Sequence, residues 1–61
     1  MPVVSITMYE GRNLEQKRNM IRRLTDVMVE TIDCKPEQVI VMIEDIKKEN
    51  IGSSGVLDID R

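Results

Sequence analysis

The feature that most constrains this chain is the uninterrupted apolar run Val-Ile-Val-Met-Ile at residues 39–43. A strand with one solvated face alternates apolar and polar residues, whereas a strand without alternation is buried on both faces. We therefore predict a strand buried on both faces, which Glu44, Asp45 and Ile46 extend. Burial on two sides requires two covering layers, and 61 residues leave little chain to provide them.

A first strand is predicted at residues 3–9, Val-Val-Ser-Ile-Thr-Met-Tyr, which are rich in β-branched types. Alternate residues Val4, Ile6 and Met8 give this strand one strongly apolar face. A turn or bulge is expected at residues 10–12, where Gly11 is free to take a positive φ.

An amphipathic helix of about five turns is predicted to follow that turn. Asn13 is a good N-cap, and Gln16 three residues later completes the pattern of a capping box. Pro36 is expected to stop the helix, because Lys35 before a proline is pushed out of the α region. The apolar residues at helical spacing are Leu14, Ile21, Leu24, Met28 and Ile32, with Met20, Val27 and Val29 widening the stripe.

The order strand, helix, strand predicts a parallel strand pair joined by a right-handed crossover. This is a βαβ unit of the α/β (α+β) class, and residues 1–61 are expected to form a single domain. One helix covers one face of that pair, so the other face must meet another subunit. So short a domain is marginal alone. One cysteine and no histidine exclude an internal disulfide and a common zinc site, which leaves oligomerisation as the stabilising device.

The last third of the chain allows two interpretations. Residues 52–55, Gly-Ser-Ser-Gly, form either a hairpin turn or a flexible loop. A short strand from Val56, Leu57 and Ile59 is a candidate to pair with a neighbouring subunit.

Charge and composition exclude several functions. A net charge of −2 is too small to direct the chain to nucleic acid or to an anionic membrane. No apolar run approaches the roughly 18 residues of a membrane span, and no secretory signal pattern is present. These features predict a cytoplasmic location, with Cys34 at the helix end as a structural or incidental thiol.

The usual catalytic side chains are scarce, which draws attention to Pro2. The chain has no histidine, and Gly52–Gly55 lacks the lysine and helix of a phosphate loop. Removal of Met1 would expose Pro2 as a secondary amine, and an α-amino group titrates near about 7.7–8.0. An apolar pocket or a cation such as Arg12 would lower that pKa towards neutrality, which suits a general acid–base. With Met1 attached, the nitrogen is a tertiary amide without basicity.

The whole chain resembles the 4-oxalocrotonate tautomerase family. The matching motifs are Met-Pro-Val-Val at the start, Glu-Gly-Arg at 10–12, Glu-Gln-Lys-Arg at 15–18, Pro-Glu-Gln-Val at 36–39 and the Gly52–Gly55 stretch. The resemblance implies a βαβ unit with a short C-terminal hairpin, assembled as a hexamer, a trimer of dimers. It implies keto–enol isomerisation of unsaturated 2-oxo or 2-hydroxy acids, with no cofactor and no metal.

The resemblance also assigns the expected site. Pro2 matches the general base and acid, and Arg12 the arginine that binds the distal substrate carboxylate. Ile40 stands where the best-known members carry a second arginine, which polarises the 2-oxo group, and losing such a donor typically costs about 2.7–4 kcal/mol. Ile51 stands where the family has an aromatic pocket wall, and it keeps that wall apolar.

Two alternatives keep the scaffold. In a related decarboxylase or hydratase, a protonated Pro2 would act as an acid. In a non-catalytic oligomeric scaffold or binding protein, the fold would remain without the activity, which Ile40 and a retained Met1 would favour. A nucleic-acid role is weakest, because the chain is acidic and lacks an aromatic stacking platform.

Overall fold

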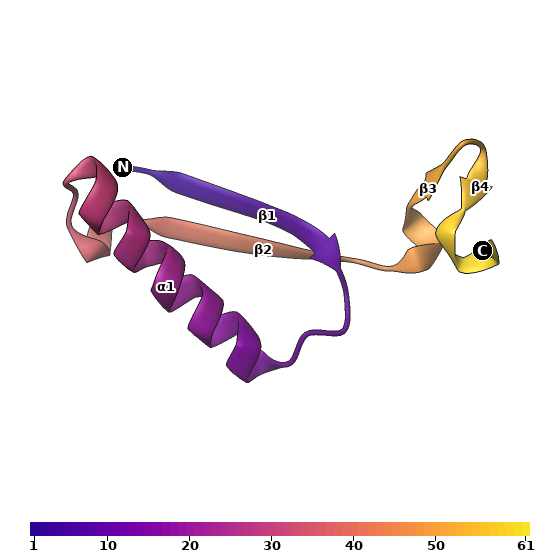
Figure 1. The fold of residues 1–61 in the computed structure, drawn as a ribbon, viewed down its shortest axis with the longest axis horizontal. Coiled ribbons are helices and arrows are strands. Elements are labelled where there is room, and N and C mark those ends of the chain that lie inside the picture. Colours follow the sequence, from indigo (N-terminus) through magenta and orange to yellow (C-terminus); the bar gives the residue numbers. More distant parts are fainter.

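A computed structural model describes all residues 1–61 (Figure 1). The main elements are strand β1 (Val3–Tyr9), helix α1 (Leu14–Ile32) and strand β2 (Ile40–Ile46). The short strands β3 (Gly52–Ser53) and β4 (Val56–Leu57) follow. Three single 3₁₀ turns connect or end these elements: η1 (Pro36–Gln38), η2 (Lys48–Asn50) and η3 (Asp58–Asp60).

The two long strands form a parallel pair, as predicted from the strand–helix–strand order. Their register runs without a bulge from Val3 opposite Ile40 to Tyr9 opposite Ile46. Helix α1 crosses one face of this pair (Figure 1). The predicted βαβ unit is therefore confirmed.

Both ends of α1 are set by local side-chain and backbone preferences. The Asn13 side chain accepts a hydrogen bond from the backbone N–H of Gln16 (2.8 Å), and the Gln16 side chain accepts one from Asn13 N–H (3.0 Å), so the predicted capping box is present. The helix ends at Ile32, because Asp33 adopts the left-handed conformation (φ 55°, ψ 52°) that Asp tolerates better than most residues. Lys35 is extended, as expected before Pro36, but the helix has already ended three residues earlier, at Ile32.

The face of the strand pair under α1 carries the apolar contacts of the chain. The side chains at alternate positions of β1 and β2 are half-buried on this face: Val4, Ile6, Met8, Val41 and Ile43. Lys17 of α1 and Asp45 of β2 form an ion pair across this contact, with Nζ 2.5 Å from Oδ2. No residue of the chain is fully buried, so this contact is the beginning of a core rather than a complete one.

The opposite face, here called the open sheet face, consists by strand alternation of Val3, Ser5, Thr7, Tyr9, Ile40, Met42, Glu44 and Ile46. Val3 and Met42 are 54% and 53% exposed. The apolar run of β2 predicted a strand covered on both sides, and within one chain α1 covers only one of them. Part of the predicted helix stripe is uncovered too, since Leu14 and Ile32 are exposed.

The dimensions of the chain agree with an incomplete core. Its radius of gyration is 15.0 Å and its extents are 44 × 24 × 13 Å. A compact domain of this length has a radius of gyration of about 10.5 Å. The chain is thus an extended plate with an incomplete core and one face left open.

The C-terminal arm, residues 47–61, projects beyond the end of the strand pair (Figure 1). Strands β3 and β4 pair antiparallel, and positive φ at Ser54 (52°) and Gly55 (77°) gives the two-residue turn typical of a tight hairpin. The hairpin interpretation of residues 52–55 is therefore confirmed. The strand at 56–57 pairs with β3 of its own chain, and Ile59 lies in η3 rather than in a strand.

Within the arm, the Arg61 guanidinium donates hydrogen bonds to the Ser53 carbonyl oxygen (2.6 Å) and to Ser53 Oγ (2.7 Å), which connects the C-terminus to the hairpin.

No helix in the structure combines the length and the apolarity that crossing a membrane requires.

Candidate active site

Pro2 lies directly before β1 and is half-buried. Its carbonyl oxygen accepts a hydrogen bond from the Ile40 backbone N–H (3.0 Å), which is the first bond of the parallel pair. Met1, in contrast, is 83% exposed. Pro2 is thus held by the sheet while the residue bonded to its nitrogen extends into solvent.

Ile40 is the first residue of β2 and lies beside Pro2. It belongs to the open sheet face and is 40% exposed. Its aliphatic side chain offers no hydrogen-bond donor. The residue hydrogen-bonded to the Pro2 carbonyl oxygen is therefore apolar, and the second arginine that the resemblance led us to expect is absent from this position.

Arg12 lies beyond the other end of β1. The seven residues of that strand span about 23 Å, so Pro2 and Arg12 of one chain cannot contact the same small substrate. Gly11, with φ at 123°, turns the chain out of the strand just before Arg12. Arg12 is exposed and takes part in none of the four ion pairs of the chain.

Ile51 lies where the arm leaves the strand pair, at the same end of the sheet as Arg12. It lines a shallow hollow of about 200 Å³ together with Thr7, Met8, Tyr9 and Ile46. The Ile51 carbonyl oxygen accepts a hydrogen bond from Asp58 N–H (2.9 Å), which connects Ile51 to the first residue of η3. Within one chain, Pro2 and Ile40 therefore lie at one end of the sheet, and Arg12 and Ile51 at the other.

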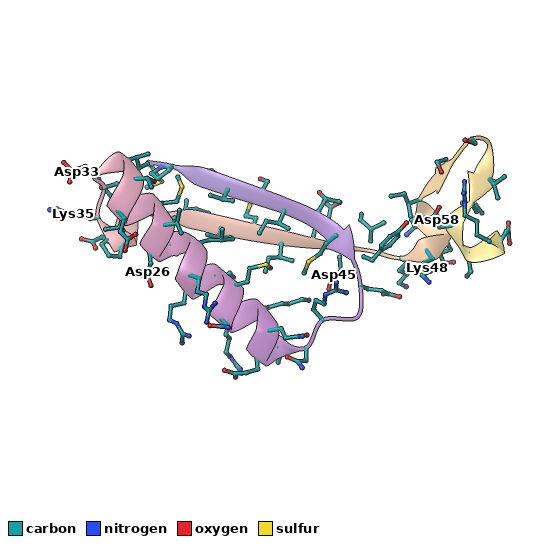
Figure 2. All side chains as sticks on the ribbon, in the orientation of Figure 1. Asp26, Asp33, Lys35, Asp45, Lys48 and Asp58 are labelled. Atoms are coloured by element: carbon teal, nitrogen blue, oxygen red, sulfur yellow. The ribbon has the colours of Figure 1, made fainter.

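A larger open hollow of about 660 Å³ lies next to the first one. Its lining residues are Tyr9, Glu10, Gly11, Asp45, Lys47, Lys48, Glu49 and Ile59. Figure 2 shows Lys48 and Asp58 together at the base of the arm and Asp45 near the end of β2. Tyr9 lines both hollows and so joins the Ile51 wall to the segment that leads into Arg12.

The sequence predicts Tyr9 only as a strand residue, and its place between two hollows at this end of the sheet becomes apparent only in the fold. The available signal was that Tyr9 is the only aromatic residue and directly precedes Glu-Gly-Arg. The thiol of Cys34 is half-buried and lies 3.7 Å from the Met28 carbonyl oxygen, which agrees with a structural role.

Comparisons with known proteins place the chain in a family. The fold of the chain is similar to that of a crystallised 4-oxalocrotonate tautomerase homologue, with a TM-score of 0.92 and 33% identity over 100% of this chain and 97% of that one. The sequence model described as "Tautomerase enzyme" matches residues 2–58. The chain belongs to the tautomerase family.

Two further relatives add detail. A 2-hydroxymuconate tautomerase of Comamonas testosteroni is 43% identical over 56 residues, which are 92% of this chain and 89% of the relative. A heterohexameric 4-oxalocrotonate tautomerase from Chloroflexus aurantiacus is 27% identical, with a TM-score of 0.85 over 98% of this chain and 97% of that one.

Proposed function

We propose that the protein is a keto–enol tautomerase of unsaturated 2-oxo and 2-hydroxy acids that uses Pro2 as general acid and base after removal of Met1. The observation that carries this proposal is the position of Pro2, anchored to Ile40 at the residue where the family match begins. The small second residue, Pro2, favours removal of Met1. The similarity to a 2-hydroxymuconate tautomerase supports the substrate class.

The reaction needs only a proton carrier. The Pro2 nitrogen takes the proton from the 2-hydroxyl group of the enol, the electron pair moves through the conjugated double bonds, and the proton returns to a distal carbon. One O–H bond breaks and one C–H bond forms, so substrate and product have the same formula and no cofactor is required. A free α-amino group titrates near about 7.7–8.0, and the apolar side chain of Ile40 nearby favours its neutral, basic form.

The separation of the expected residues supports a site that is shared between chains. Because about 23 Å of strand lie between Pro2 and Arg12, the arginine and the Ile51 wall must come to Pro2 from another protomer. The open sheet face supplies an apolar surface for that association. We therefore propose a homo-oligomer, as a hexamer built from three dimers, and the heterohexameric relative supports the subunit number.

Arg12 is proposed to bind the distal carboxylate of a diacid. A guanidinium offers two parallel, charge-assisted hydrogen bonds to a carboxylate, and Arg12 is free of intramolecular ion pairs that would compete. Ile40 and Ile51 are proposed as apolar substrate contacts. The free thiol of Cys34 suits a reducing compartment, so we propose a cytoplasmic location.

The proposal is tested with the processed protein, whose intact mass must show the loss of Met1. Ketonisation of 2-hydroxymuconate is followed by its ultraviolet absorbance for the parent and for Pro2→Ala. We expect activity in the parent and its loss in the variant, with the oligomeric mass unchanged.

Activity that survives in Pro2→Ala, or a processed parent no faster than buffer, would refute the proposal. A product heavier by one water or lighter by one carbon dioxide would instead assign a hydratase or a decarboxylase. An inactive parent that assembles normally would favour the non-catalytic scaffold, for which Ile40 is the supporting observation.

A further inference from the structure

Tyr9 occupies a position that the proposed reaction leaves unexplained. It is the last residue of β1 and lines both hollows at that end of the sheet, one with Ile51 and the other with Gly11 and Lys48. It is 41% exposed, and none of the side-chain hydrogen bonds of the chain involves its hydroxyl group. A polar group on an apolar ring is thus presented, without a partner in the chain, beside Ile51 and beside the segment that leads into Arg12.

The proposed reaction requires a hydrogen-bond donor that Ile40 cannot provide. When the 2-hydroxyl group loses its proton, negative charge develops on the 2-oxygen of the substrate. Donors aimed at such an oxygen in a site shielded from water are usually the largest single source of rate enhancement. A neutral phenol is a suitable donor, because tyrosine hydroxyls stabilise enolate oxygens in other isomerases.

The distances along the chain allow Tyr9 and Arg12 to act on one substrate. The three residue steps between them span at most about 11 Å even when fully extended. Gly11 turns the chain between them, which shortens that reach. One chain can therefore hold both a carboxylate, through Arg12, and a second oxygen of the same acid, through Tyr9.

The charged neighbours of Tyr9 are weaker candidates for this role. Lys47 lies 4.0 Å from Glu49, and Asp45 is paired with Lys17, so these charges are already partly balanced. Lys48 lines the larger hollow and enters no ion pair, which makes it the one other donor that needs a test.

We propose that the Tyr9 hydroxyl donates a hydrogen bond to the 2-oxygen of the substrate and so takes over the part of the donor that is missing at Ile40. This inference rests on the proposed tautomerase function. The phenol keeps its proton throughout, and the proton that moves from oxygen to carbon travels on the Pro2 nitrogen. Tyr9 is then a catalytic residue of the site that another protomer's Pro2 completes.

The kinetic test compares the processed parent with Tyr9→Phe, which keeps the ring and removes only the hydroxyl group. We expect kcat for 2-hydroxymuconate to fall by about 10²–10³-fold with little change in KM, because the bond strengthens as charge develops. Lys48→Met is the matched control and should leave kcat close to the parent's. Equal kcat for Tyr9→Phe and the parent would overturn the inference, and so would a large loss in Lys48→Met alone.

A spectroscopic test is independent of turnover, because the chain has one tyrosine and no tryptophan. Tyrosine fluorescence therefore reports on Tyr9 alone. Titration with 2-oxoadipate should change this fluorescence, whereas adipate, which has both carboxylates and no 2-oxygen, should leave it nearly unchanged. An equal response to the two acids, or none to 2-oxoadipate, would contradict the bond.

The two proposals fail in different ways. Parent activity that Pro2→Ala abolishes and Tyr9→Phe leaves intact would overturn the role of Tyr9 alone. A parent without any Pro2-dependent activity would overturn the proposed function and the role of Tyr9 with it. Light scattering on Tyr9→Phe must show the parent's oligomeric mass, so that a kinetic loss is assigned to the hydroxyl group and not to disassembly.

Discussion

The open sheet face leads to a prediction about assembly that can be worked out from exposures. Fully burying a Val, Ile or Met side chain is worth about 1.5–3 kcal/mol. Val3, Ile40 and Met42 are each about half exposed. Covering the remainder is therefore worth about 0.8–1.5 kcal/mol per side chain, or about 2–4 kcal/mol for the three in each protomer.

Met42→Lys tests this estimate at the centre of the face. The substitution loses about 1 kcal/mol of apolar burial. It also places an ammonium group in the interface, where the effective desolvation penalty is several kcal/mol. The sum exceeds what the three side chains contribute together, so the oligomer should dissociate. Because the isolated chain has no fully buried residue, the released protomer should also unfold.

Light scattering and far-ultraviolet circular dichroism at micromolar concentration measure both effects. The parent should show a multiple of the protomer mass and a cooperative thermal transition, whereas Met42→Lys should show the protomer mass and little secondary structure. Asp26→Asn is the matched control, because it makes the same change in net charge on an exposed residue of α1. A Met42→Lys protein with the parent's mass and thermal midpoint would refute the role of this face in assembly.

Three further predictions concern the site and its supports. Arg12→Ala should raise KM for a diacid far more than for a monoacid such as phenylenolpyruvate, and an equal loss on both would contradict its role at the distal carboxylate. Asn13→Ala removes the N-cap and should lower the free energy of unfolding by about 1 kcal/mol, measured by thermal melting, with kcat unaffected; an unchanged midpoint would show that the cap contributes nothing. Gly52→Ala would bring a Cβ 2.5 Å from the Val56 carbonyl oxygen, so the hairpin should open and the arm should become sensitive to proteases, whereas parent-like resistance would contradict the tight approach.

For the candidate site, the sequence pattern predicts individual residues but not which of them lie together. Pro2 and Arg12 are proposed from their motifs, because the Met-Pro start and Glu-Gly-Arg are local in sequence. Motifs do not show which residues share a site, and the length of β1 separates these two within one chain. Tyr9 has no motif of its own. Its position between two hollows depends on β1, the end of β2 and the C-terminal arm meeting in space.

Some features of the fold follow from neighbours along the chain and were predicted from the sequence by itself. The capping box needs only Asn13 and Gln16, and the turn after β1 needs only the conformational freedom of Gly11. The βαβ order follows from the spacing of apolar residues, since that spacing sets which face of each element can be buried.

Other features were decided only by the tertiary structure. The helix ends at Ile32, with Asp33 as its C-cap, rather than running on to Pro36, and strand β4 of the hairpin pairs with β3 of its own chain. The apolar run of β2 predicted burial on both faces, yet a single α1 covers one face and leaves Met42 half exposed. The physical reason is that burial depends on which distant elements lie opposite a residue. For this plate-like chain, no element of the same chain covers the open sheet face, which is the surface proposed for association with another protomer.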